Sequence, residues 1–499
     1  MVESESELAN AFRSASAEAK AAFGDDRLFI ERRLPRGRHI EVQIAVDAKG
    51  SAMSLGCRDC SVQRRHQKVI EEAPPPGISQ DLCAELERAA VQLVERVGYV
   101  GVGTVEFLLI GQEFSFLEVN PRLQVEHGIT EELTGIDLVQ LQIRIARGES
   151  LPRCREAESR VAIEARVCAE DPQADFLPTP GRIALFDPAL GPRVRLDSGV
   201  SAGCRVPAEF DSLIAKLIAT GETREEARAR LACALTDFEL VVAGGATNKG
   251  YLIDILETPE YRRGDFDTEW LDRTPEVRAA WDCYLVEELL AAAIRPYQRY
   301  RDGARLKFYA VPATLSPTSI PSSTGQRVDL TAGAESYRLE VFGVGAWRYR
   351  VHLDGRVAVA PLSDERANSA ILELGGRYLR VLHDVSERGL RIEIEAHPYR
   401  FTSELAGQVR CGTPAVVIGL QVAPGDRVEA GQSLGLLEAM KSEIDFRAPV
   451  SGVVKEVCVR TGQQVSSGEL LLIIEAEAEA RDAFNVSYRQ RLTLLSDSD

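Results

Sequence analysis

Glu438-Ala439-Met440-Lys441 is the stretch that decides the fold of the C-terminal part of this chain, because similar segments flank it on both sides. Residues 422–432 precede it and residues 460–468 follow it. Each flank consists of a short apolar segment, a glycine turn, a valine and a second glycine turn. Short apolar segments bounded by glycine turns are typical of β-strands. The repeat predicts a small β-barrel or sandwich with two equivalent halves and Lys441 near its centre.

Lys441 is predicted to lie on the tight turn between strands at 433–437 and 443–447, accessible to a modifying enzyme. A lone lysine is usually a solvated surface residue, but its central position and the Ala-Met-Lys tripeptide favour an attachment site. Residues 405–475 resemble the biotinyl domain of biotin-dependent carboxylases. The resemblance implies that a biotin protein ligase attaches biotin to Lys441. Met440 replaces the aspartate usual in lipoyl domains and favours biotin, whereas Ser442 replaces the family's usual methionine.

The composition limits the classes of protein to consider. The chain has 499 residues and a net charge of −17, which predicts about three domains and argues against nucleic acid or a membrane as partner. No apolar run approaches the roughly 20 residues of a membrane-spanning helix, and the acidic N-terminus has no signal-peptide core. Cys57 and Cys60 form an isolated C-x-x-C pair among ten scattered cysteines. A zinc site would need further ligands, so we expect reduced thiols in a cytoplasmic protein.

Apolar spacing predicts the elements of the first hundred residues. A helix is expected at 4–23, where apolar residues recur every three or four positions before Gly24. Strands are expected at 28–34 and at 39–46, the second with one apolar and one polar face. Residues 58–68 are dense in cations and are expected to form a basic loop, either solvated or bound to an anionic ligand. An amphipathic helix is expected at 79–97.

Two carboxylates are predicted to face each other on a hairpin. Strands at 103–109 and 114–119 are joined by residues 111–113, and the register that sets Ile110 opposite Phe114 also sets Glu106 opposite Glu118. Like charges directly opposite destabilise a sheet. We therefore expect cations between the two carboxylates, and carboxylates combined with substrate phosphates are the usual ligands of Mg²⁺.

The second strand of this hairpin is predicted to continue as a polar ladder. Five polar side chains occur at every second position: Glu118, Asn120, Arg122, Gln124 and Glu126. In an extended backbone all five point to one side. Two acidic, two amide and one cationic group in this order are more regular than an ordinary solvated edge, and they predict a binding site.

Residues 1 to about 272 resemble the C-terminal half of a biotin carboxylase of the ATP-grasp superfamily. The matching stretches follow the family's order along the chain: 38–43, 58–72, 118–127, 164–167, 169–172, 176–178, 211–216 and 247–248. The resemblance implies ATP and bicarbonate as substrates and a carboxyphosphate intermediate. It also implies a preceding nucleotide-binding-like domain and a Gly-rich phosphate loop, and no such loop occurs before residue 100. The chain is therefore expected to begin within the end of the lid.

The resemblance implies a role for each matching residue. The Mg²⁺ (or Mn²⁺) ions that bridge ATP would be held by Glu106, Glu118 and Asn120. The nucleotide would be contacted by Glu31, Leu34, His39, Gln63 and His66. Bicarbonate would be surrounded by Lys68, Arg122, Gln124 and Val125. Glu126 would be the base that deprotonates bicarbonate and Arg166 would stabilise the enolate of biotin, so the predicted catalytic residues are Glu126, Arg122, Arg166 and Lys68.

The middle of the chain is predicted to be a helix followed by strands. The helix is expected at 275–301 and a Pro/Ser/Thr-rich connection at 304–328. Strands are then expected at 337–342, 347–353, 357–361, 370–374, 377–382 and 390–395. This order resembles the region of acyl-CoA carboxylase α subunits that contacts the carboxyltransferase. The predicted fold class is α+β, divided into a lid remnant (1–30), a carboxylase domain (31–272), a helix-and-barrel domain (273–400), a biotinyl domain (405–475) and a tail (476–499).

Three functional interpretations follow from these patterns. The first is an enzyme that carboxylates biotin on its own Lys441 and supplies a separate carboxyltransferase acting on an acyl-CoA; the family's pairing also implies a possible homodimer. The second is a non-catalytic carrier and scaffold whose carboxylase region needs a missing N-terminal half. The third, another ATP-grasp ligase fused to a lipoyl-type carrier, would need different residues around Lys441 and Arg122.

Overall fold

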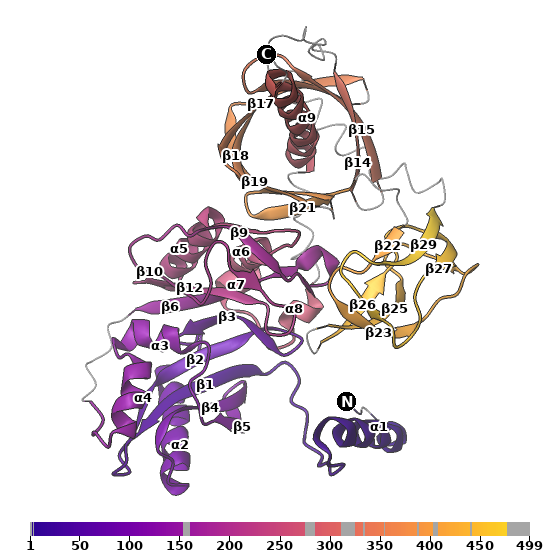
Figure 1. Ribbon diagram of the computed structural model, residues 1–499. Helices are drawn as coiled ribbons and strands as arrows, with labels where there is room; N and C mark the ends of the chain where they lie inside the picture. Colours follow the sequence, from indigo (N-terminus) through magenta and orange to yellow (C-terminus); the bar gives the residue numbers. More distant parts are fainter. Residues whose placement is uncertain are drawn as a thin grey trace.

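A computed structural model gives the structure of the chain as three bodies of mixed α and β content, which confirms the predicted fold class (Figure 1). Residues 5–274 form a carboxylase-like body, residues 285–402 a helix inside a barrel, and residues 408–476 a β-sandwich. The residues described are 2, 4–152, 160–274, 285–310, 325–332, 335–353, 355–386, 389–402, 408–439 and 442–476. Met440 and Lys441 therefore lie outside the described residues.

The N-terminal helix α1 spans Glu5–Phe23 and ends as predicted at Gly24, which has a φ of 74° and donates its N–H to the carbonyl of Lys20. The predicted strand at 28–34 is wrong. This segment is irregular, and the side chains of Phe29 and Ile30 are 83% and 76% exposed. No described strand pairs with it, so its backbone has no ladder to join.

An eight-stranded antiparallel sheet forms the centre of the carboxylase-like body, in the order β10-β12-β6-β3-β2-β1-β4-β5. Its strands are β1 Arg38–Val46, β2 Ala52–Arg64, β3 Gln67–Ala73, β4 Gly101–Ile110, β5 Glu113–Asn120, β6 Val161–Cys168, β10 Val194–Ser198 and β12 Leu213–Gly221. Helix α2 (Gln80–Arg96) confirms the amphipathic prediction and packs Leu86 and Ala90 against β1, β2 and β4. The hydroxyl of Ser79 caps it by accepting from the Leu82 N–H.

The predicted basic loop at 58–68 is wrong, because these residues belong to the β2–β3 hairpin. Only Arg65 and His66 form its turn, with φ values of 48° and 63°. Arg58 is completely buried within β2. Its guanidinium is hydrogen-bonded to polar groups inside the body. The density of cations along the sequence does not reveal that these hydrogen-bond partners exist.

The β4–β5 hairpin pairs Glu106 with Glu118, as predicted, but the strand register near the turn differs from the predicted one. The turn pairs Ile110 with Glu113, one residue away from the expected partner, and a β-bulge between Glu106 and Phe107 restores the register. The strand ends at Asn120, so the prediction of one extended ladder to Glu126 is wrong. Pro121, which has no N–H to continue a ladder, directly follows the last strand residue.

The remaining elements of this body surround the large sheet. The helices are α3 His127–Thr134, α4 Leu138–Ala146, α5 Arg224–Asp237, α6 Lys249–Glu257, α7 Pro259–Arg263 and α8 Trp270–Arg273, with a 3₁₀ turn at Pro172–Ala174. The short strands are β7 Glu170–Asp171, β8 Leu177–Pro178, β9 Gly181–Asp187, β11 Arg205–Val206 and β13 Glu239–Val242. Helices α5 and α6 pack together beside β6 and β12.

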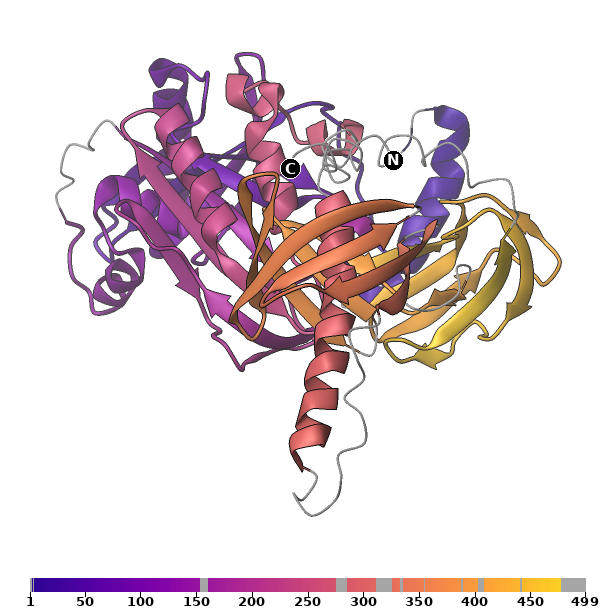
Figure 2. The ribbon, with the colours of Figure 1, turned by 90° about the horizontal axis from the view of Figure 1, so that it is seen from above.

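The second body is an eight-stranded antiparallel meander wrapped around helix α9 (Leu285–Ala310), as Figures 1 and 2 show. Reciprocal backbone hydrogen bonds between Thr331 and Thr402 join its first and last strands. The strands are β14 Gln326–Ala332, β15 Glu335–Gly343, β16 Arg348–Leu353, β17 Arg356–Arg366, β18 Ser369–Leu374, β19 Arg377–Ser386, β20 Gly389–Ile394 and β21 His397–Phe401. The six predicted strands are confirmed, whereas β14 and β21 were missed.

The predicted connection at 304–328 is partly wrong. Helix α9 continues to Ala310, and β14 begins at Gln326. Residues 275–284, where the helix was expected to start, and residues 311–324 lie outside the described residues. Within the barrel, apolar side chains of α9 such as Leu289, Leu290 and Ile294 are buried by the surrounding strands.

The third body consists of two four-stranded sheets, β22-β29-β27-β24 and β26-β25-β23-β28. The strands are β22 Gln408–Arg410, β23 Ala415–Leu420, β24 Arg427–Val428, β25 Ser433–Ala439, β26 Ser442–Arg447, β27 Gly452–Val457, β28 Gln464–Val465 and β29 Leu470–Ala476. Gly425 and Gly431 in one half match Gly462 and Gly468 in the other, and all four have φ between 82° and 97°. The predicted repeat is thus a repeat of left-handed glycine turns.

Ion pairs connect the barrel to the carboxylase-like body. Lys249 Nζ lies 2.9 Å from a Glu393 carboxylate oxygen, and both side chains are 1% exposed. His397 Nε2 lies 3.0 Å from Asp254 Oδ1. None of the helices in the described part of the chain has the length and apolar content needed to cross a membrane.

Candidate active site

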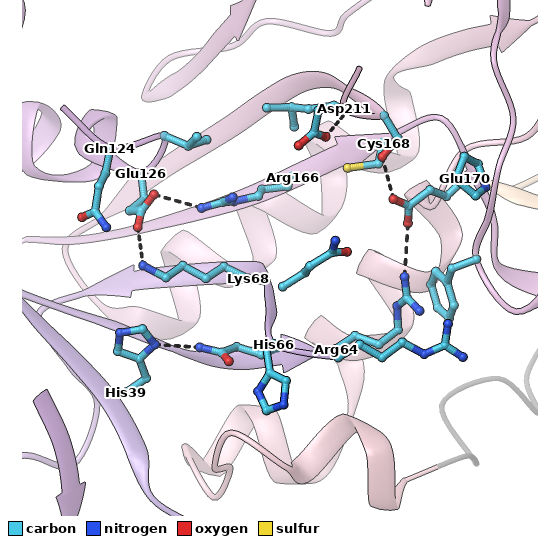
Figure 3. Close-up of a pocket in the computed structure, with 18 of the residues that line it drawn as sticks. His39, Arg64, His66, Lys68, Gln124, Glu126, Arg166, Cys168, Glu170 and Asp211 are labelled. Carbon is cyan, nitrogen blue, oxygen red and sulfur yellow. Dashed lines mark hydrogen bonds and ion pairs between the residues drawn. The ribbon is translucent and has the colours of Figure 1, made fainter. Parts of the chain in front are cut away.

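A cleft of about 790 Å³ runs along the end of the large sheet, bordered by the β2–β3 and β4–β5 hairpins and by β6 (Figure 3). Most of the predicted site residues line it: His39, Gln63, His66, Lys68, Glu106, Glu118, Asn120, Arg122, Gln124, Val125, Glu126 and Arg166. Glu443 and Ile444 of the β25–β26 hairpin line the same cleft. The structure thus brings residues that are up to about 400 positions apart in the sequence around one cavity.

Glu126 lies between two cations on the wall of the cleft. Its side chain is 2% exposed at the start of α3. Lys68 Nζ donates to Oε1 at 2.5 Å, and Arg166 Nη2 donates to Oε2 at 2.9 Å (Figure 3). Both carboxylate oxygens are fixed in this way, and a fixed carboxylate in a cleft suits proton transfer.

Lys68 is shared by three carboxylates. Besides Glu126, it contacts Glu41 Oε2 at 2.8 Å and Glu106 Oε1 at 3.3 Å. Burial alone lowers the pKa of Lys68, but the charges of Glu41, Glu126 and Glu106 outweigh it and raise the pKa above its usual range. Lys68 therefore remains a cation and can hold an anionic substrate.

The carboxylates of Glu106 and Glu118 meet at Asn120, whose Nδ2 donates to one oxygen of each at 3.0 Å. Burial raises the pKa of Glu106, but the hydrogen bond from His39 and the charge of Lys68 outweigh it and lower the pKa to about 2. Glu106 is therefore ionised at any pH near neutrality. Two carboxylates are hard donors of the kind that Mg²⁺ prefers, so Glu106 and Glu118 fit the expected metal, whereas Asn120 presents its amide nitrogen to them.

His39 is held in one tautomer by its neighbours. Gln63 Nε2 lies 2.8 Å from Nδ1, and because the amide nitrogen can only donate, Nδ1 accepts. Nε2 then carries the hydrogen and donates to Glu106 Oε2 at 2.9 Å. His39 and Gln63 thereby orient a predicted metal ligand from inside the sheet.

Sequence reasoning missed Arg58 as a supporting residue. Its guanidinium donates to Glu41, to Gln43 and Thr130 at 2.8 Å, and to Gln124 at 3.2 Å. It therefore fixes Gln124 directly and Lys68 through Glu41. The pairing of Glu41 with Arg58 in the β1–β2 register was the available signal, because a polar strand face needs polar partners when it is buried.

Sequence reasoning also missed Lys216 and Glu71, which support Val125 and Arg166 in the cleft. Lys216 Nζ donates to the carbonyl of Val125, and Arg166 Nε donates to Glu71 Oε1 at 2.6 Å. Burial raises the pKa of Glu71 and of Glu164, which lies beside Lys216. These contacts orient Arg166 toward Glu126 and fix the backbone next to it.

Three predicted residues are not among those that line the described cleft. Glu31 and Leu34 belong to the irregular segment before β1, and the described cleft lining does not include them. Cys57 packs in the apolar cluster under α2, whereas Cys60 lies near Glu41 and Glu126, so the two thiols face different surroundings. Lys441 lies outside the described residues, although its hairpin reaches the cleft.

Comparison with known proteins matches three family models to the chain. "Carbamoyl-phosphate synthase L chain, ATP binding domain" covers residues 1–154, "Biotin carboxylase C-terminal domain" covers 164–273, and "Biotin-requiring enzyme" covers 407–474. The methylcrotonoyl-CoA carboxylase subunit alpha of Arabidopsis thaliana is 32% identical over 95% of this chain and 72% of its own length. The human propionyl-CoA carboxylase alpha chain is 34% identical over 94% of this chain and 68% of its own length.

Solved structures resemble the carboxylase-like body. The biotin carboxylase of Campylobacter jejuni, in complex with β-γ-ATP, has a TM-score of 0.52 and 38% identity over 55% of this chain and 61% of its own. The biotin carboxylase domain dimer of Hydrogenobacter thermophilus 2-oxoglutarate carboxylase, with MgADP and bicarbonate, has a TM-score of 0.53 and 36% identity over 55% and 60%. The chain thus spans about three fifths of these structures.

The fold and the cleft define an ATP-grasp-type carboxylase joined to a carrier domain. The chain belongs to the family of biotin-dependent acyl-CoA carboxylase α subunits, as two relatives above 30% identity across two thirds or more of their length show. Biotin, ATP and Mg²⁺ are the cofactors that the matching domains and solved relatives use.

Proposed function

We propose that this chain uses ATP and bicarbonate to carboxylate biotin carried on its own Lys441, and then supplies a carboxyltransferase that acts on an acyl-CoA. The observation that carries the proposal is Glu126 held between Lys68 and Arg166 in a cleft that also contains Glu106, Glu118 and residues of the carrier hairpin. A biotin protein ligase attaches the biotin. The domain boundaries predicted from the sequence, a homodimer and a cytoplasmic location belong to the same proposal.

The residues divide the chemistry by charge. Glu106, Glu118 and Asn120 would hold Mg²⁺ against the nucleotide phosphates, and Lys68 and Arg122 would neutralise bicarbonate. Glu126 accepts the bicarbonate proton, and a bicarbonate oxygen then attacks the terminal phosphate of ATP, which forms carboxyphosphate and releases ADP. Transfer of the carboxyl group from carboxyphosphate to biotin releases phosphate. Fixed cations stabilise the charge that spreads over the phosphoryl oxygens in the transition state. Arg166 faces the same carboxylate and would orient the carrier-borne biotin for the transfer of the carboxyl group.

A second function has one observation in its favour. Glu31 and Leu34, the predicted contacts of the adenine, are not among the residues that line the described cleft. If the nucleotide site of this chain is incomplete, the chain would act as a biotin carrier and scaffold, and another polypeptide would complete the site. The experiment below separates the two functions.

The test is ATP cleavage that depends on both bicarbonate and free biotin, measured with the purified chain. Glu126→Gln should lower the rate by about 10²-fold or more, because it removes the general base. Glu113→Gln, an exposed carboxylate at the turn of the β4–β5 hairpin, is the matched control and should leave the rate unchanged. Equal rates for Glu126→Gln and the wild type, with Lys441 biotinylated, would favour the carrier function.

A further inference from the structure

A leucine of β8, Leu177, packs against the carrier domain. Leu177 is half-buried and packs against the apolar core of the carrier. The fit at Gly412 is close: a Cβ added there would lie 2.0 Å from Leu177 Cδ2. Leu177 therefore occupies a recess that exists only because position 412 has no side chain.

The recess belongs to a rigid part of the carrier. The Ser467 hydroxyl donates to the Gly412 carbonyl at 2.8 Å, and the Gly468 N–H donates to the Cys411 carbonyl at 2.7 Å. The neighbouring Cys411 and Thr413 side chains are buried. An added methyl group at 412 therefore requires the Cδ2 methyl of Leu177 to move from its place in the recess.

Leu177 is fixed from the other side by a strained loop. The preceding residues Asp175 and Phe176 have φ values of 54° and 60°, in the left-handed region that non-glycine residues rarely occupy. Arg65 Nη2 holds Asp175 Oδ2 at 2.6 Å, and the Arg64 guanidinium lies 3.9 Å from the centre of the Phe176 ring. Such strain persists where the surroundings over-determine it, and it gathers at functional sites.

The neighbours of Leu177 on both sides line the catalytic cleft. Phe176 and Pro178 are part of its wall, together with Glu443 and Ile444 of the carrier hairpin. The hairpin of Arg64 and Arg65 continues into His66 and Lys68. One short loop therefore contacts the carrier with one side chain and the cleft with the next.

We propose that Leu177 and Gly412 form a docking latch that positions the carrier of a chain at the cleft of the same chain. The inference rests on the proposed function. Leu177 acts as a positioning residue: when it is seated at Gly412, the β25–β26 hairpin lies at the mouth of the cleft. Because both surfaces belong to one chain, the rate of carrier carboxylation per chain should not change on dilution.

The experiment compares Gly412→Ala with Gly419→Ala in the full biotinylated chain. Gly419 lies in the same domain with no atom within 4 Å of an added Cβ, so its substitution is the matched control. Gly412→Ala should lower bicarbonate-dependent ATP cleavage driven by the attached biotin by about tenfold or more. The rate with saturating free biotin should stay the same, because the latch is not part of the cleft chemistry. Complete biotinylation of Lys441 confirms that the carrier is folded.

Hydrogen exchange provides a readout that does not depend on activity. Gly412→Ala should deprotect peptides that cover β8 and peptides that cover residues 408–415, whereas Gly419→Ala should not. Leu177→Ala should weaken docking, and adding Gly412→Ala to it should have little further effect, because the two groups share one contact. Wild-type exchange and wild-type carrier-dependent rates in Gly412→Ala would overturn the proposal. Absence of free-biotin activity in the wild type would refute the proposed function instead, and the exchange result would still decide the latch.

Discussion

At the scale of single residues, the carboxylates of the cleft differ in burial and in hydrogen-bond partners, and we expect them to differ in function for that reason. Glu106 is 4% exposed and is surrounded by donors that lower its pKa to about 2. Its partner Glu118 is exposed on the edge strand and shares Asn120 with it. Glu126 shares Lys68 with Glu106 and is also held by Arg166. The buried carboxylate is thus pre-organised, and the exposed one remains free to meet a metal ion.

Glu118→Gln should therefore raise the Mg²⁺ concentration needed for half-maximal ATP cleavage by about tenfold or more, because one anionic ligand is lost. The maximal rate at saturating Mg²⁺ should fall much less than it does in Glu126→Gln. A titration of the rate with Mg²⁺ measures both effects, with Glu113→Gln on the same hairpin as control. An unchanged Mg²⁺ requirement would remove Glu118 from the metal site.

At the scale of elements, the barrel and its central helix carry a buried histidine with a strong pH dependence. His383 of β19 is 8% exposed. Burial, followed by the positive charge of Arg295 on α9, lowers the pKa of His383 from 6.5 to about 4. His397 of β21 shifts the other way: burial lowers its pKa, but the hydrogen bond and charge of Asp254 outweigh it and raise the pKa above 6.5.

The two histidines predict opposite effects of pH on stability. Between pH 6.5 and 4 the unfolded chain protonates His383 while the folded barrel does not, so stability falls as the pH falls, by about 3 kcal/mol in total. The contribution of His397 is present below pH 6.5 and is lost as the pH rises through its folded pKa. His383→Gln should flatten the acid side of a plot of barrel unfolding against pH, and His397→Gln the alkaline side. Titration of both imidazoles by NMR checks the assignment, and a His383 pKa near 6.5 would contradict it.

At the scale of the whole molecule, buried and exposed ion pairs join the barrel to the carboxylase-like body. Lys249 and Glu393 are both 1% exposed, whereas Arg366, which pairs with Asp187, is 52% exposed. Removing one partner of a buried pair leaves an uncompensated charge at a cost of about 3 kcal/mol or more. An exposed pair contributes about 1 kcal/mol or less.

Lys249→Met should therefore lower the urea midpoint of this interface much more than Arg366→Met does. The midpoint can be followed by hydrogen exchange in α6 and β20, the elements that carry Lys249 and Glu393. Similar effects for the two variants would mean that the buried pair is not what holds the two bodies together. The carrier should be unaffected in both variants, because its latch at Leu177 lies elsewhere.

The sequence by itself determined the features that depend on local spacing. Apolar periodicity located α1 and α2, and the glycine repeat located the two halves of the carrier. The opposition of Glu106 and Glu118 was also predicted, although the folded hairpin reaches it through a β-bulge that the sequence did not reveal. Motifs in family order also identified the residues that now line one cleft. These signals survive in the sequence because neighbouring residues in one strand or turn obey fixed backbone geometry.

Tertiary structure decided everything that depends on partners far apart in the chain. Arg58 looks like a solvated cation until Glu41, Gln43 and Thr130 are seen around it. Residues 28–34 have the composition of a strand but no described neighbour to pair with. Leu177 and Gly412 are 235 positions apart (412 − 177), and only the folded chain brings them into contact. Burial, pairing and docking are properties of the surroundings of a residue, and a linear pattern does not contain them.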